Sequence, residues 1–310
     1  MRPFSIRKHY TTTDISSRYN SHIHTNVPEF KVPKDRISLQ ILFKSLPKLG
    51  ERELNELASH VSHRAPAFTY HFPKDTSVDG EGVAATDKYK IKFAFCNRRL
   101  EERELAQISA HIRLVPDAAE KIEEHQSYID ISVEPDSEKP LAAYQMLAFL
   151  ACMIATPNGL AITNINGFTS FNAQQVLTLF GDDDWVDAIE NMPPLFLFSG
   201  PVIHEFDDNE QLWMRSYGNH LLGIPDLGTI ISKEIVQEYV PMTLEVMDNI
   251  MSYMIESGNK VEPGHTMESE TVVINVKEQP AKPDEYFYQS PSGMLRIEYT
   301  PKPGFVLPRF

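Results

Sequence analysis

The run from Leu212 to Gly228, LWMRSYGNHLLGIPDLG, carries the side chains of this chain that are best suited to chemistry. An arginine can bind an anion, a histidine can exchange a proton near neutral pH, and a tyrosine or an aspartate can orient either group. One interpretation is an enzyme pocket in which four side chains converge: Arg215, Tyr217, His220 and Asp226. Arg215 would then hold an anion, and His220 would serve as acid or base.

A second interpretation of this run is a contact surface for a partner. Side chains alternate between the two faces of a strand, so Trp213, Arg215 and Tyr217 share one face of a strand over 211–217. Trp, Tyr and Arg dominate binding hot spots, although the same trio could anchor a C-terminal helix. The neighbouring residues indicate a structural junction, which favours a contact surface over a catalytic centre.

The same run contains four residues that predict structural turns: Gly218, Gly223, Pro225 and Gly228. Glycine allows backbone conformations that other residues resist. The segment from Ile224 to Gly228 is typical of a tight turn, and we expect it to lead into a helix that begins near Ser232.

No complete catalytic or metal-binding motif occurs elsewhere in the sequence. The GxSxG, HExxH, P-loop and dinucleotide-binding patterns are absent, which lowers the expectation of an enzyme. His22 and His24 form an HxH pair, but no third ligand lies nearby, and the sequence predicts neither a metal nor a cofactor. His204 is expected to be a structural histidine.

Charge is distributed unevenly along the 310 residues. The chain has 29 basic and 43 acidic residues, a net charge of −14, but residues 1–36 hold seven basic and three acidic ones. The remaining 22 basic and 40 acidic residues give the body of the chain a net charge of −18. This balance disfavours binding of nucleic acid, which requires clustered Lys and Arg, and favours a small ligand or a basic protein partner. Solubility alone is an alternative explanation.

The cysteines and the hydropathy pattern predict a cytoplasmic protein. Cys96 and Cys152 lie in apolar runs without a CxxC pair, so we expect buried thiols in a reducing compartment. The N-terminus lacks the apolar core of a secretory signal. Residues 141–155 are almost wholly apolar but too few to cross a bilayer, so they predict a helix buried in the domain and no membrane insertion.

The spacing of apolar residues predicts interleaved strands and helices. Strands are expected at 37–43, 67–72, 89–96, 127–133, 159–166, 195–206, 211–217, 270–277 and 294–299. Helices are expected at 51–65, from about 101, after Pro116, at 141–155, 172–180 and 184–191, and from 232 to 258, where Pro241 should kink the helix or begin a new one. These elements indicate an α+β fold with mixed or antiparallel sheets, with ferredoxin-like repeated units as one arrangement.

Composition divides the chain into four segments. Residues 1–36 form a basic arm that is expected to be disordered or to bind a partner, and 300–310 form a Pro-rich tail. Between them, residues 37–88 are expected to form a β-α-β unit and 89–299 the main α+β domain. The boundary follows from the polar, Gly-containing loop at 73–88, which is the clearest internal break and a plausible mobile segment.

Five segments carry a resemblance to a bacterial family: EEHQSYIDISVEPDS, GLAITNINGF, WMRSYGNHLLGIPDLG, YMIESGNKVEPGHTM and SPSGMLRIEY. Over about residues 89–299 they resemble the family called domain of unknown function 4261. The resemblance rests on the order of the elements and on the run that contains a glycine, then a Leu-Gly pair, then a proline followed by an acidic residue. Members of that family mostly have an aliphatic or small residue where Asn219 and His220 stand. The resemblance therefore implies no role for His220.

The family has no established activity, and some members resemble immunity or accessory proteins found beside secretion-system toxins. The resemblance implies a soluble protein-binding protein that neutralises or escorts a toxin. The acidic body of the chain suits a basic toxin. Two alternatives stay open. One is the enzyme with a pocket near Arg215, Tyr217, His220 and Asp226, and the other is a structural or adaptor component of a secretion system.

Overall fold

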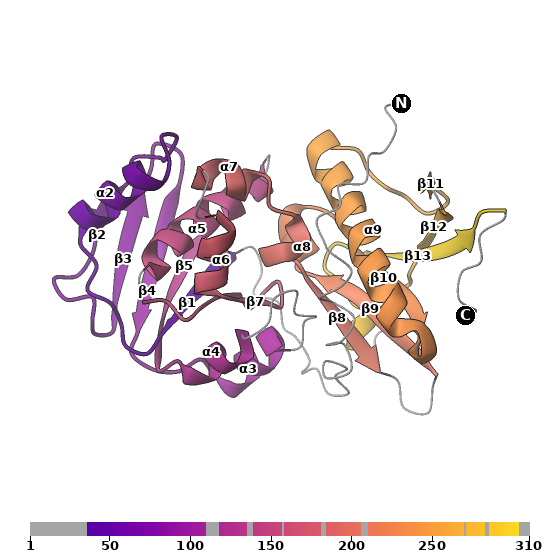
Figure 1. Cartoon of the computed structure of the whole chain (residues 1–310), viewed down its shortest axis with the longest axis horizontal. Coiled ribbons are helices and arrows are strands. Elements are labelled where there is room, and N and C mark those ends of the chain that lie inside the picture. The colour runs from indigo at the N-terminus through magenta and orange to yellow at the C-terminus, as the bar shows by residue number, and fades with distance from the viewer. Residues whose placement is uncertain are drawn as a thin grey trace.

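The computed structural model describes residues 36–109, 118–134, 139–156, 158–180, 184–205, 210–269, 271–282 and 285–303. In this part of the chain two β-sheets lie beside one another, each with helices against it (Figure 1). Its strands pair antiparallel, except for one parallel pair in the second sheet. The α+β class with mostly antiparallel sheets is thereby confirmed.

The first sheet has the strand order β2-β3-β4-β5-β1-β6-β7. Its strands are β1 (Ile37–Phe43), β2 (Thr69–His71), β3 (Gly80–Ala85), β4 (Lys90–Cys96), β5 (Ser127–Val133), β6 (Ala161–Asn164) and β7 (Thr169–Asn172). β1 pairs with β5 over its full length, from Ile37 opposite Val133 to Phe43 opposite Ser127. Every residue of β1 is buried, in keeping with its central place.

Helices cover both faces of the first sheet. On one face α5 (Pro140–Ala155) packs against β1, β5 and β6, and α2 (Glu51–Val61), α6 (Ala173–Phe180) and α7 (Trp185–Glu190) contact it (Figure 1). These neighbours bury most of α5, so the prediction of a buried helix is confirmed. α3 (Glu102–Ser109) and α4 (Ala118–Glu124) contact β7 on the other face.

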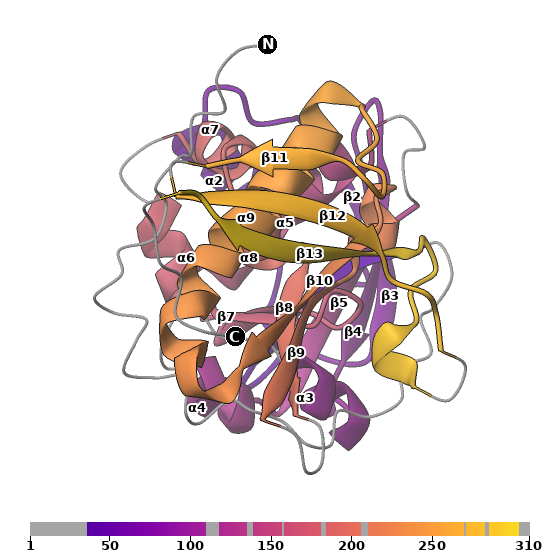
Figure 2. The ribbon, with the colours of Figure 1, turned by 90° about the vertical axis from the view of Figure 1, so that its right-hand side faces the viewer.

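The second sheet has the order β11-β12-β13-β10-β9-β8 and faces the viewer in Figure 2. Its strands are β8 (Gly200–Glu205), β9 (Gln211–Tyr217), β10 (Asp226–Ser232), β11 (Thr266–Glu268), β12 (Val272–Glu278) and β13 (Met294–Pro301). Behind it runs α9 (Val236–Ser257), whose stripe at Val240, Leu244 and Met247 lies in the core. This helix passes unbroken through Pro241, so no new helix begins there, and it ends at Gly258 as predicted.

One hydrophobic core extends through both sheets. The short helix α8 (Pro194–Leu197) connects them, and Asn164 at the end of β6 donates to the carbonyl oxygens of Leu197 (3.2 Å) and Phe198 (3.3 Å). The Phe168 ring stacks on Tyr217 of β9, with 4.2 Å between ring centroids. The end of the first sheet is thus packed directly on the second.

Two predictions about this part of the chain are wrong. Residues 73–88 are not a domain break, because β3 lies within them and pairs with both β2 and β4. The proposed boundary between residues 88 and 89 therefore lies inside a hairpin of the first sheet. The segment 195–206 begins with α8 instead of a strand, since Pro194 at the first helical position favours a helix start.

Some predictions concern residues outside the described ranges. These are the arm at 1–35 with His22 and His24, the turn at 206–209, and the tail from residue 304. In the part of the chain that the structure does describe, no helix has the length and apolarity that crossing a membrane requires. Three or more His, Cys, Asp or Glu side chains nowhere come together there as metal ligands would.

Candidate functional site

The run from Leu212 to Gly228 forms two paired strands and the turn between them. β9 leads into a single 3₁₀ turn, η2 (Asn219–Leu222), and β10 returns beside β9 with Gly228 opposite Arg215. The prediction of a tight turn over Ile224–Gly228 is wrong, because Asp226 already begins a strand that pairs with β9 and β13.

Arg215 lies in the interior, with 1% of its surface exposed. Its Nη2 is 2.5 Å from Oδ2 of Asp226, and its Nη1 donates to the carbonyl oxygens of Phe287 (2.9 Å) and Gln289 (2.8 Å). The guanidinium also lies over the Tyr217 ring, 3.8 Å from its centroid. These partners compensate a charge that would otherwise be costly to bury.

Trp213 and Tyr217 are buried on either side of Arg215. Trp213 Nε1 donates to the Phe287 carbonyl oxygen at 3.1 Å, and the Tyr217 hydroxyl is hydrogen-bonded to His204 Nε2 at 2.9 Å. The three side chains face the interior, so the prediction that they form an accessible contact surface is wrong. A Cβ at Gly228 would overlap the Trp213 ring, which explains the glycine in β10.

Three of the four residues of the expected enzyme pocket converge, but no space for a substrate lies between them. Arg215 contacts Tyr217 and Asp226, and their exposed fractions are 1%, 5% and 1%. His220 is half-buried in η2. Because the convergence is interior packing, the expected accessible pocket at these residues is wrong.

The turn residues around η2 shape the backbone. Gly218 and Gly223 flank η2 in the left-handed conformation, with φ of 95° and 74°. A Cβ at Gly218 would also lie 2.8 Å from the Cα of Gly167, so glycine lets the two sheets approach. Pro225 stands just before β10, and its carbonyl oxygen accepts a hydrogen bond from Asn219 Nδ2 at 3.0 Å.

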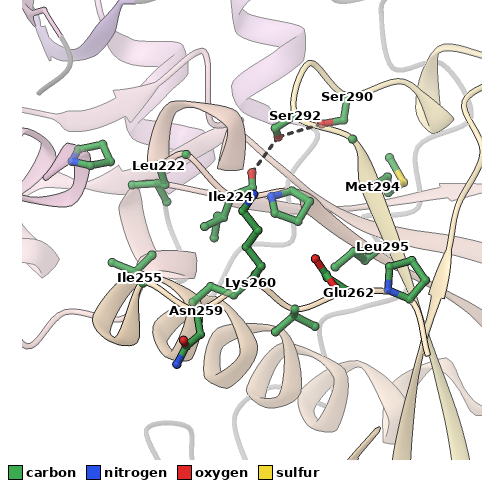
Figure 3. A pocket seen from close by; sticks show the side chains of 18 of the residues that line it. Leu222, Ile224, Ile255, Asn259, Lys260, Glu262, Ser290, Ser292, Met294 and Leu295 are labelled. Carbon is green, nitrogen blue, oxygen red and sulfur yellow. Dashed lines mark hydrogen bonds between the residues drawn. The ribbon is translucent and has the colours of Figure 1, made fainter. Parts of the chain in front are cut away.

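The buried ion pair holds two segments that continue to the surface. Arg215 fixes the carbonyl oxygens of Phe287 and Gln289, and the Asp226 backbone N–H donates to the Gly293 carbonyl oxygen at 3.1 Å. Near the surface, Ser292 Oγ donates to the Ile224 carbonyl oxygen at 2.8 Å (Figure 3). Residues 222–225 and 288–295 are thereby held side by side.

A groove of about 1230 Å³ opens beside these two segments. Its walls come from the start of α5, from η2 and the turn that follows, from the C-terminal end of α9 with the loop 258–263, and from the residues around the start of β13 (Figure 3). Helices and loops that pack on different sheets therefore contribute to one site.

The apolar floor of the groove consists mostly of core side chains that are at most 8% exposed, while Leu141 and Ile255 are half-buried. Its apolar side chains include Leu141, Leu222, Ile224, Met254, Ile255, Val261, Met294 and Leu295. Small-ligand pockets have volumes of roughly 300–1,000 Å³, so this groove is large enough for an extended peptide segment.

The polar part of the groove consists of charged side chains and hydroxyl groups. Charged side chains on its rim are Lys139, Glu256, Lys260, Glu262 and Glu278, and the hydroxyls of Ser290 and Ser292 also line it. No His or Cys is among the lining residues, so the histidine base or thiol of familiar nucleophilic sites is missing. The arrangement suits binding.

A second hollow, of about 880 Å³, lies on the face of β3, β4 and β5 that carries Lys90 and Lys92. Lys92 Nζ is 3.5 Å from Glu134 Oε1, and Arg36 pairs with Asp130 at 2.7 Å. Burial raises the pKa of the Asp130 carboxyl, against the effects of Arg36 and Gln40. Because several of its charges are paired within the chain, this hollow is a weaker candidate than the groove.

Sequence reasoning named Gly223 and Pro225 as turn residues, but it did not identify them or the other lining residues as parts of a groove. A usable signal was present in two turn-rich segments, GNKVEPG at 258–264 and SPSG at 290–293, because loops held by a rigid scaffold often carry function. Comparisons of the chain with protein-family models, with curated proteins and with solved structures found no match.

Proposed function

We propose that this chain is a protein-binding protein that receives an extended segment of a partner in the groove. The groove itself carries the proposal, since it has an apolar floor, a polar rim and about 1230 Å³ of space. An extended segment can place alternate side chains on such a floor while its backbone groups meet the rim.

Charge supports a basic partner. The body of the chain has a net charge of −18, and three of the five charged side chains on the rim are glutamates. Complementary charge of this kind steers association and rejects acidic competitors.

The proposal includes a cytoplasmic location and kinship with the domain of unknown function 4261. Two segments that carry that resemblance, 253–267 and 290–299, supply groove walls, and Cys96 and Cys152 are free thiols. In this account the chain neutralises or escorts a basic toxin by covering one of its extended segments.

Reconstitution with the natural partner tests this function. Purification of the chain from its organism of origin should recover a stoichiometric basic protein, and the purified pair should associate more slowly as salt rises. Ile255→Gln places an uncharged polar group on the apolar floor at a half-buried position, and it should weaken the complex by about tenfold or more.

The matched control is Val78→Gln, which introduces the same amide at an exposed apolar residue outside the groove. Its affinity for the partner should equal that of the wild type. Failure to recover any stoichiometric partner, or equal weakening by the two variants, would contradict the proposed function.

A further inference from the structure

The hollow on β3, β4 and β5 has small side chains between long ones. On this face, Ala94 of β4 lies opposite Asp130 of β5. In the next pair on the same face, Lys92 lies opposite Ser132. The short side chains of Ala94 and Ser132 leave room between their longer neighbours for the hollow of about 880 Å³. This volume is within the range of small-ligand pockets, which is roughly 300–1,000 Å³.

Ser132 lines the hollow with a hydroxyl group that has no hydrogen-bond partner. Only 2% of this residue is exposed, and within the described ranges its Oγ forms no hydrogen bond. Ser38, which lies opposite Ser132 on β1, differs in this respect. Its Oγ accepts hydrogen bonds from Gln40 Nε2 at 3.3 Å and from Asn166 Nδ2 at 3.5 Å. Because a buried polar group without a partner is costly, the Ser132 hydroxyl is available to an acceptor oxygen of a ligand.

Two lysine side chains stand beside this hydroxyl. Lys92 is the direct cross-strand neighbour of Ser132, so their Cβ atoms are about 5 Å apart. Its Nζ is 3.5 Å from Oε1 of Glu134, but both side chains of this pair are largely exposed, so the pair is weak. Lys90 precedes Lys92 by two residues on the same face of β4, and among the described residues its ammonium forms no ion pair. Both ammonium groups are therefore available to a ligand.

The hollow differs in charge from the rest of the chain. Its lining includes four Lys or Arg residues and three Asp or Glu residues, whereas the whole chain has a net charge of −14. Of the acidic residues, Glu81 and Glu134 are exposed. Asp130 is paired with Arg36 at 2.7 Å and accepts a hydrogen bond from Gln40 at 3.1 Å. The local excess of positive charge favours an anion.

We propose that the hollow on β3, β4 and β5 binds a small phosphorylated ligand, independently of the partner segment in the groove. A phosphate oxygen accepts a hydrogen bond from the Ser132 hydroxyl, and the ammonium groups of Lys90 and Lys92 compensate the charge. A phosphate group has three acceptor oxygens and close to two negative charges, which match one hydroxyl and two ammonium groups. A single carboxylate has one charge and leaves one ammonium unmatched.

Isothermal titration calorimetry with phenyl phosphate tests the proposal, with malonate as a carboxylate probe at a pH where both are dianions. Ser132→Ala should weaken the binding of phenyl phosphate by about tenfold, because a hydrogen bond to a charged acceptor is lost. Lys90→Met should weaken it by a similar factor. Lys277→Met makes the same change in net charge on β12, outside the hollow, and should leave the affinity unchanged. The wild type should bind malonate about tenfold more weakly than phenyl phosphate.

Urea denaturation separates loss of the site from loss of the fold. In the described part of the chain Ser132→Ala breaks no hydrogen bond, so it should keep the free energy of unfolding of the wild type, whereas Ser38→Ala should lower it. The proposal is overturned if phenyl phosphate does not bind the wild type, binds Ser132→Ala equally well, or binds no more tightly than malonate. Weaker binding to Ile255→Gln would place the ligand in the groove and would also overturn it.

Discussion

Arg215→Met should lower the free energy of unfolding by about 3–5 kcal/mol, because it leaves Asp226 as an uncompensated buried carboxylate. The carbonyl oxygens of Phe287 and Gln289 lose their donor in the same variant. Urea denaturation followed by tryptophan fluorescence measures the change, since Trp213 lies beside the ion pair and is buried. Loosening of residues 287–289 should also weaken peptide binding in the groove.

Arg64→Met is the control for this prediction. Arg64 pairs with Asp187 and Glu190 on the surface, so its loss should cost far less stability. The double variant Arg215→Met with Asp226→Asn removes both buried charges and should be more stable than Arg215→Met alone. If Arg215→Met costs no more than Arg64→Met, the buried pair does not have the role assigned to it.

Asp248→Asn should stabilise the protein above neutral pH. Asp248 lies on α9, and its Oδ1 accepts a hydrogen bond from the Leu195 N–H at 3.3 Å, at the start of α8. Burial raises the pKa of this carboxyl from 3.8 to about 7, against the lowering effect of that hydrogen bond and with a contribution from Glu256. A pKa raised in the folded state means that stability is lost as pH rises from about 4 to about 7.

Asparagine keeps an acceptor for Leu195 and never ionises, so the variant lacks this loss. The stability difference between Asp248→Asn and the wild type should be near zero at pH 4 and should reach at most ~4 kcal/mol above pH 7. Denaturation at a series of pH values measures it, with Glu238→Gln on the exposed side of the same helix as control. A difference that does not grow with pH would show that Asp248 ionises as freely in the folded protein as in the unfolded one.

Local pattern was enough to predict the elements with strong periodicity. The strands at 37–43, 127–133 and 211–217 have the predicted bounds, and α5 lies where the apolar run is. β3 was missed because GEGVAA has a weak strand propensity, and it is a strand only because β2 and β4 pair with its two edges. β7 and β11 have four and three residues, too few to show alternation.

The surroundings of the candidate site residues could not be predicted from local sequence pattern either. Alternation along β9 correctly placed Trp213, Arg215 and Tyr217 on one face, but it could not show whether that face meets solvent or protein. The answer depends on Phe287, which is 72 residues beyond Arg215 in the chain. The groove likewise combines segments from 139–142 to 288–295, a proximity that no local pattern contains.

Hydrogen–deuterium exchange tests the central claim, that the groove is where a basic, apolar segment binds. With a saturating ten-residue peptide that alternates Leu with Lys, amide exchange should slow in residues 222–225, 254–263 and 288–295 and should stay unchanged in β3 and β4 of the first sheet. Slower exchange confined to β3, β4 and β5, or unchanged exchange throughout the groove segments, would contradict the account.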